Sequence, residues 1–189
     1  MSNITKTWLN STLCLEKKLY LPPLKKQQLI EYAKCSENVQ LWRYVKILRY
    51  CGYYSSNSSK SFLFGLLSLI YKRKLNILGT KLGLRIGYCS FDSGLQIYHS
   101  GNIVVNGKAK IGKNCRLHGS NCIGNSHNND DCPVIGDNVR FGVGAKAFGN
   151  IYIADNVTIA AGAVVTKSCY QKGAVLAGIP AKVIKVNTF

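Results

Sequence analysis

Three histidines, His99, His118 and His127, are the side chains best suited to proton transfer in this chain. An imidazole titrates near neutral pH, so it can remove a proton from a hydroxyl group as a general base. His99 stands in the segment IYHSGNIVVN, His118 follows an apolar position, and His127 lies in a polar stretch. The pattern predicts a surface or subunit-interface position for His118, whereas His127 could reach a substrate from its loop.

Metal ligation is a different use of such side chains, and the sequence does not favour it. The three histidines have no close pair, and the eight cysteines contain no C-x-x-C spacing. We therefore expect no metal ion. Cys115 and Cys169 fall at small positions of the repeat described next, which predicts a reduced protein that uses them as small apolar side chains.

The segment from Ile135 to Val165 repeats with a period of six residues, which is neither the helical period nor the alternation of a simple strand. The lead apolar positions are Ile135, Phe141, Ala147, Ile153, Ile159 and Val165. The same phase extends backwards through Ile123, Leu117, Ile111 and Val105 to His99. By this phase alone, the imidazole of His99 is predicted to point inward as a buried polar group.

A six-residue period predicts one short flat strand and one turn per unit, with three units in each turn of a parallel coil. Gly, Asn and Asp in the units suit turns that need unusual backbone angles. The polar run NSHNNDDCPV, residues 125–134, interrupts the repeat. It is predicted to leave one corner of the coil as a loop, where functional residues are often found.

The part of the chain before the repeat is predicted to be helical. Apolar residues recur at helical spacing in residues 24–35, 37–54 and 60–78, and the first 20 residues are ambiguous. The segment SSNSS, residues 55–59, is predicted to be a linker. The chain thus divides into a helical region, residues 1–82, and a coil, residues 83–189, whose open end the helices cap.

The net charge is +17, and it is concentrated before the repeat. Residues 1–90 carry 15 basic and 3 acidic side chains, a difference of +12. A solvated basic helical face explains this plainly, and attraction to an anionic membrane surface is an alternative. Nucleic acid is not expected as a partner, because no recognition motif is present. No apolar run is long enough for a membrane-spanning helix, and no secretory signal is expected.

The segments IYHSGNIVVN, IGDN, GVGAKAFGN, AAGAVVTK and GIPAKVIK resemble the serine-acetyltransferase branch of the hexapeptide-repeat acetyltransferases. Within that branch they resemble most the relatives that O-acetylate capsular or other surface polysaccharides. The resemblance covers about residues 79–186. It implies a mainly β fold, a left-handed parallel β-helix with an N-terminal α-helical cap, and a homotrimer.

The resemblance also implies functional residues. His99 corresponds to the general base, which activates an acceptor hydroxyl for attack on the thioester of acetyl-CoA. The co-substrate would lie in a groove between subunits of the trimer, and the residues implied to contact it are Asn125, Val143, Ala161, Lys167 and Lys182. Tyr98 and His127 are implied to be near the acceptor.

The sequence departs from the serine-acetyltransferase pattern at three points. Tyr98 stands where the family has an Asp before its catalytic His, and Leu84 falls near the Asp that supports this His. The family's Arg-His-Pro, whose Arg holds the serine carboxylate, corresponds here to residues 131–133, Asp-Cys-Pro. Because Asp131 would repel a carboxylate, we expect a sugar hydroxyl as acceptor, in a bacterial surface or capsular polysaccharide or its precursor.

Three alternatives stay open at this point. The first is serine O-acetylation, as in cysteine biosynthesis. The second is a scaffold that kept the coil without activity. The third is a metal-dependent hydratase with three histidines on zinc, although the histidine spacing differs from that class. In every case a cytoplasmic location is expected, with peripheral association at the inner membrane face for the glycan enzyme.

Overall fold

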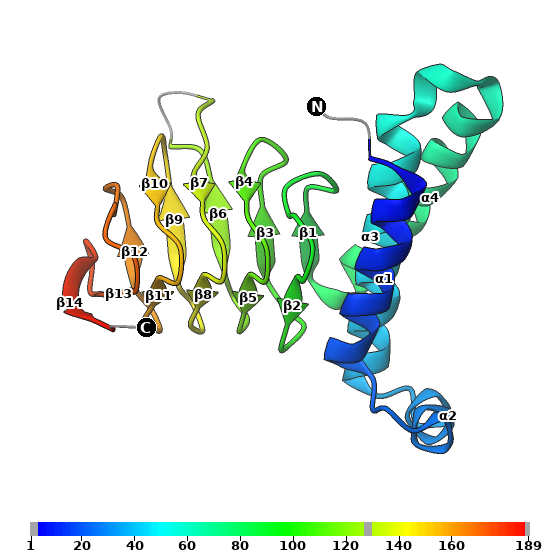
Figure 1. Cartoon of the computed structure of the whole chain (residues 1–189), viewed down its shortest axis with the longest axis horizontal. Helices are drawn as coiled ribbons and strands as arrows, with labels where there is room; N and C mark the ends of the chain where they lie inside the picture. Colours follow the sequence, from blue (N-terminus) through cyan, green and yellow to red (C-terminus); the bar gives the residue numbers. More distant parts are fainter. Residues whose placement is uncertain (1–3, 127–129, 188–189) are drawn as a thin grey trace. The chain divides into compact units, whose positions relative to one another are not determined.

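The structure is a computed structural model that describes residues 4–126 and 130–187. It divides into two compact units, residues 1–82 and 83–189. The first unit is helical and the second consists of short strands (Figure 1).

From residue 4 to residue 82, where the structure describes this unit, the helices are α1 (Lys6–Tyr20), α2 (Lys25–Ala33), α3 (Glu37–Ser56), the short 3₁₀ helix η1 (Ser58–Lys60) and α4 (Phe62–Leu82). The hydroxyl of Thr5 caps α1 by accepting a hydrogen bond from the Trp8 N–H at 3.1 Å. α3 supplies most of the buried apolar side chains of this unit. No helix among the described residues has the length and apolarity needed to cross a membrane.

The segment predicted as a linker is instead ordered by its own side chains. α3 continues to Ser56, and η1 follows after Asn57. The amide of Asn57 donates to the carbonyl oxygens of Ile4 at 2.9 Å and Tyr53 at 2.8 Å, which ties this bend to the start of the chain. The linker prediction was wrong because Ser and Asn also form such side-chain to backbone bonds.

An ion pair lies inside the helical unit. The carboxylate of Glu16 on α1 accepts hydrogen bonds from Arg49 on α3, at 2.6 Å from Nη2 and 3.1 Å from Nε. The two side chains are only 0% and 2% exposed. The Arg49 guanidinium also lies over the Trp8 ring, 5.5 Å from its centre. These two hydrogen bonds join α1 to α3 through a buried ion pair.

The second unit is a left-handed parallel β-helix. The six-residue period predicted the parallel coil, and the family resemblance implied its left hand. Its strands form three sheets that run along the coil (Figure 1). Sheet A contains β1 (Leu84–Ile86), β3 (Ile103–Val105), β6 (Cys122–Gly124), β9 (Lys146–Phe148) and β12 (Val164–Val165). Sheet B contains β4 (Lys110–Ile111), β7 (Val134–Ile135) and β10 (Tyr152–Ile153).

Sheet C contains β2 (Gln96–Ile97), β5 (Arg116–Leu117), β8 (Arg140–Phe141), β11 (Thr158–Ile159), β13 (Ala174–Ala177) and β14 (Lys182–Val186). Among the strands of the described residues, β14 alone pairs antiparallel, and its partner is β13. A strand that turns back in this way covers the last parallel edge of the coil, which would otherwise invite further strand pairing.

The interior of the β-helix is filled by the lead residues and the small residues two positions before them. Leu117, Phe141 and Ile159 stack in register on sheet C and are fully buried. Cys115 occupies a small inward position, where burial raises the pKa of its thiol to about 12. Cys115 and Cys169 are buried free thiols, as their small positions in the repeat predicted.

A ladder of asparagines holds the corner between sheets B and C. Asn114, Asn138 and Asn156 adopt φ values of 56°, 58° and 61°, in the left-handed region. The Asn114 amide donates to the Asn138 side-chain oxygen at 3.0 Å, and the Asn138 amide donates to Asn156 at 3.0 Å. Asparagine tolerates this backbone conformation better than most residues, which explains its recurrence at one corner.

We expect Asn138→Ala to destabilise the β-helix more than Asn138→Gly. Both variants lose the two ladder hydrogen bonds, at a cost of roughly 1 kcal/mol for such exposed groups. Alanine alone also pays about 1–2 kcal/mol for the left-handed backbone. Urea denaturation of both variants measures the difference. Equal stabilities would show that the φ at this corner carries no cost.

Candidate functional site

His99 lies on the surface of the β-helix, at the corner between sheets C and A. The prediction that it keeps the inward phase was wrong. Ile97 is the lead residue here, because it pairs with Leu117, and the next lead residue is Val105. Five residues, 98–102, therefore form the corner, whereas three residues, 142–144, suffice two coils later. The two extra residues carry the imidazole outward, where it is exposed.

Tyr98 and His118 stack on the outer face of sheet C, next to this corner. Their ring centres are 4.3 Å apart and their planes differ by 8°. Burial lowers the pKa of His118, and the positive charges of Arg140, His99 and Arg116 lower it further. His118 is therefore held neutral near pH 7. The predicted surface position of His118 is only half correct, because its Nε2 is buried without a hydrogen bond to any described residue.

Asn121 fixes the corner beneath the two histidines. Its side-chain oxygen accepts from the Gly119 N–H at 3.0 Å, and its amide donates to the Gly142 carbonyl at 2.7 Å. A Cβ atom on Gly119 would lie 3.7 Å from the Cβ of His99, so His99 rests against this glycine. Asn121 is fully buried at a position where the repeat has small apolar residues. A polar asparagine at this position was the sequence signal that Asn121 holds the corner in place.

Val143 and Ala161 lie at the same corner as His99, on the following coils. Val143 is 54% exposed, and Ala161 is also exposed. The backbones stack closely there, since the Gly162 N–H donates to the Val143 carbonyl at 2.8 Å. Gly142 has no room for a larger side chain, because a Cβ would come within 2.6 Å of the Ala161 nitrogen. On the coils that follow His99, this corner therefore exposes small side chains and closely stacked backbone.

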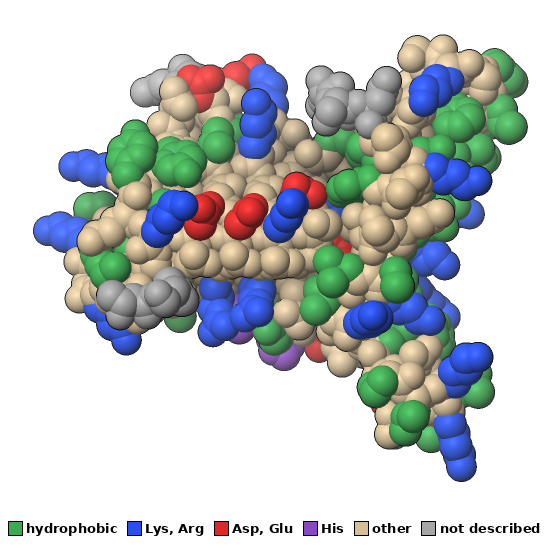
Figure 2. Space-filling view, viewed as in Figure 1, with side chains coloured by type: hydrophobic (Ala, Val, Ile, Leu, Met, Phe, Trp, Pro, Cys, Tyr) green, Lys and Arg blue, Asp and Glu red, His purple; other side chains and the backbone are tan. Residues whose placement is uncertain are grey.

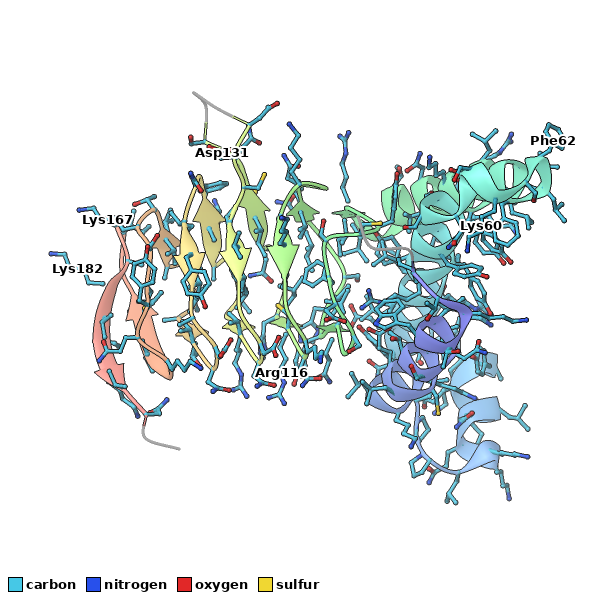
Figure 3. The ribbon with its side chains drawn as sticks, turned by 45° about the horizontal axis from the view of Figure 1, so that its top comes forward. Lys60, Phe62, Arg116, Asp131, Lys167 and Lys182 are labelled. Atoms are coloured by element: carbon cyan, nitrogen blue, oxygen red, sulfur yellow. The ribbon has the colours of Figure 1, made fainter. Side chains whose placement is uncertain are left out.

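The other residues implied to bind acetyl-CoA lie elsewhere on the β-helix. Asn125 is exposed at the corner between sheets A and B, where its side-chain oxygen accepts from the Asn106 amide at 3.0 Å. Lys167 and Lys182 are exposed and lie together at the C-terminal end of the β-helix (Figure 3). The structure of one chain therefore brings His99, Val143 and Ala161 to one corner and leaves these three residues away from it.

The interrupting loop leaves the corner between sheets A and B, because it follows β6 and precedes β7. Asp131 is exposed in it, on the side of the β-helix opposite Arg116 (Figure 3). Lys108 forms an ion pair with Asp130 at the base of the loop. His127 lies outside the described residues. Asp131 and His99 thus lie at different corners within one chain.

Two arginines near His118 were missed by the sequence reasoning. Arg116 and Arg140 face each other directly on neighbouring strands of sheet C, and both precede a lead residue. Both arginines hold the same position in the six-residue repeat, and this shared position is the sequence signal that could have identified them. Basic side chains gather beside histidine on this side of the β-helix (Figure 2). In the described ranges, no cluster of three His, Cys, Asp or Glu side chains could hold a metal ion.

The chain is similar in sequence to known serine acetyltransferases. A serine acetyltransferase of Synechococcus elongatus is 34% identical over 104 residues, which are 54% of this chain and 40% of that protein. A serine acetyltransferase of Staphylococcus aureus is 34% identical over 109 residues, which are 57% of this chain and 46% of that protein. The chain thus matches less than half the length of these relatives. No protein-family model matches the chain.

Solved structures show the same fold. A serine acetyltransferase from Brucella abortus superimposes with a TM-score of 0.74 at 21% identity, over 97% of this chain and 71% of that one. Soybean serine acetyltransferase gives a TM-score of 0.73 at 20% identity, over 95% of this chain and 70% of that one. At this level of identity the likeness shows the fold alone.

Proposed function

We propose that the chain is an O-acetyltransferase that transfers the acetyl group of acetyl-CoA to an alcohol, with His99 as general base. One observation carries the proposal. The longer corner exposes His99, and Val143 and Ala161 are exposed at the same corner on later coils. An exposed imidazole can reach a substrate, which a buried one cannot. The similarity to serine acetyltransferases supports the same reaction type.

The reaction would proceed by direct attack. His99 takes the proton of the acceptor hydroxyl, and the oxygen forms a bond to the thioester carbonyl carbon. The tetrahedral intermediate then expels the CoA thiolate, which receives the proton from the imidazolium. Backbone N–H groups at the corner are the natural donors to the oxyanion. The products are an acetyl ester and free CoA.

The residues proposed to hold acetyl-CoA fit its chemistry. The small side chains at Val143 and Ala161 let the pantetheine arm lie along the backbone, and Asn125 offers an exposed amide. Lys167 and Lys182 supply positive charge for the phosphates. Because these groups and His99 lie at different places on one chain, the proposal includes a homotrimer in which neighbouring subunits complete the site. A cytoplasmic location is part of the same proposal.

L-Serine is the first acceptor in this proposal. The relatives at 33–34% identity are serine acetyltransferases, so they favour serine over the polysaccharide acceptor expected from the sequence. A sugar hydroxyl remains the second candidate on one specific observation. The loop position that holds an Arg in serine acetyltransferases is Asp131 here, and an exposed carboxylate repels the serine carboxylate. Tyr98, engaged with His118, offers an aromatic surface for a sugar ring.

The test is the release of CoA thiol from acetyl-CoA by the purified full chain. Parallel assays contain L-serine, a panel of bacterial capsular oligosaccharides, or no acceptor. We expect release that depends on an acceptor and forms its acetyl ester, identified by mass spectrometry. Release with serine alone supports the first candidate, and release with a glycan alone supports the second. Absence of acetyl-CoA binding in a titration would overturn the proposal and favour a scaffold.

A further inference from the structure

The outer face of sheet C carries two opposed arginines. Arg116 on β5 and Arg140 on β8 are direct partners in the parallel pairing, and neighbouring strands lie about 4.8 Å apart. Gln96 precedes them on β2 and Thr158 follows on β11, so the residues at this position on the two flanking strands are uncharged. Like charges at directly opposite positions destabilise a sheet.

Neither guanidinium is neutralised by the chain. Across residues 4–126 and 130–187, no ion pair or side-chain hydrogen bond joins Arg116 or Arg140 to another side chain. Arg116 is half-buried and Arg140 is exposed. The carboxylates at the adjacent corner are engaged elsewhere, because Asp155 pairs with Lys172 at 3.0 Å and Asp137 accepts from the Lys113 N–H at 2.7 Å. Two planar, permanently charged donors are thus available on one face.

The pair lies beside the proposed general base. Arg116 lies on β5, and His118 directly follows this strand and donates its N–H to the Phe141 carbonyl at 3.1 Å, so the alternation of the strand places both side chains on the same face of sheet C. His118 is close enough to Arg116, Arg140 and His99 for each positive charge to lower its pKa. His118 in turn stacks on Tyr98, the neighbour of His99. One continuous surface therefore runs from the arginine pair to His99.

We propose that Arg116 and Arg140 bind an anionic group, a carboxylate or a phosphate, of the alcohol that receives the acetyl group. Two guanidinium groups suit one such oxyanion, because each can donate two parallel hydrogen bonds. The inference rests on the proposed O-acetyl transfer at His99. The pair would take over the role of the loop Arg in serine acetyltransferases, a position that is Asp131 here. The arginine pair would thus bind a negatively charged acceptor although the loop carries an acidic residue.

The test compares acceptors with and without an anionic group. The pairs are L-serine and L-serinamide, glucuronic acid and glucose, and glycerol 3-phosphate and glycerol, which separate an amino acid, a sugar acid and a phosphate ester. We expect the wild-type protein to prefer the anionic member of at least one pair. In Arg116→Gln/Arg140→Gln, kcat/KM for that acceptor should fall about 10- to 100-fold, as for loss of charge-assisted hydrogen bonds. The value for its neutral partner should not change.

Two controls locate the effect. Lys110→Gln removes an exposed cation from the outer face of sheet B and should leave all values unchanged. The melting temperature of the double arginine variant should equal or exceed that of the wild type, because a like-charge pair is removed. A purely structural role for the arginines predicts a lower melting temperature instead.

A binding measurement separates this inference from the proposed function. The acceptors are titrated by calorimetry into His99→Ala protein, with and without the two arginine changes. Anion binding that needs the arginines supports the inference even where no acceptor is acetylated. Equal affinity with and without them overturns it. A rise in KM for acetyl-CoA alone also overturns it, because the arginines would then bind the donor phosphates.

Discussion

Replacing His99 with alanine is expected to lower kcat for acetyl transfer by about 10²- to 10⁴-fold, the usual contribution of a general base. The side chain is exposed at its corner, so its removal leaves no buried cavity and the β-helix should keep its melting temperature. The affinity for acetyl-CoA should also persist, since Val143, Ala161 and the two C-terminal lysines are untouched. Steady-state kinetics, thermal denaturation and a CoA titration measure these three quantities.

The neighbouring histidine provides a matched control. His118→Gln changes an imidazole on the same surface, and we expect its kcat to fall far less than that of His99→Gln. Added imidazole should partly restore turnover in His99→Ala, because the corner is open to solvent. If His118→Gln carried the large loss instead, the base would be His118. Wild-type kcat in both variants would exclude imidazole catalysis at this corner.

Removing the carboxylate of Glu16 is expected to destabilise the helical unit by about 3–5 kcal/mol. Glu16→Ala removes the carboxylate that accepts two hydrogen bonds from Arg49, whose side chain is only 2% exposed. Removing one partner of a buried ion pair is costly, and the contact of Arg49 with the Trp8 ring compensates only a small part. Urea denaturation followed by Trp fluorescence measures the loss, because Trp8 and Trp42 both belong to this unit.

Two further variants separate charge from packing. Lys17→Ala, an exposed change on the same helix, should alter the free energy of unfolding by less than about 0.5 kcal/mol. Glu16→Leu/Arg49→Met replaces the pair with apolar groups and should be more stable than Glu16→Ala. A loss as small as that of Lys17→Ala would mean that the pair is not buried in the folded protein.

The two units differ in how far the sequence determines them. In the β-helix, the period of six identified the lead residues, since stacking one apolar side chain per unit is the only way to bury each short strand. In the helical region, apolar spacing predicted the helices, but nothing in the sequence paired Glu16 with Arg49. These residues are 33 positions apart, and only the packing of α1 against α3 brings them together.

The position of the candidate site depends on the number of residues in each corner, and the six-residue period does not predict that number. His99 matches the inward phase by residue number, yet two extra corner residues turn it outward, because strand pairing places Ile97 opposite Leu117. Arg116 and Arg140 become neighbours for a similar reason. They are 24 residues apart, and the loop between β6 and β7 supplies the residues beyond a regular coil. The sequence by itself determined the coil and the residue types available for chemistry. Only the tertiary structure decided which of these residues share a surface. The hydrogen bonds between neighbouring coils keep the strands aligned, so extra residues are accommodated at the corners and change which side chains lie together.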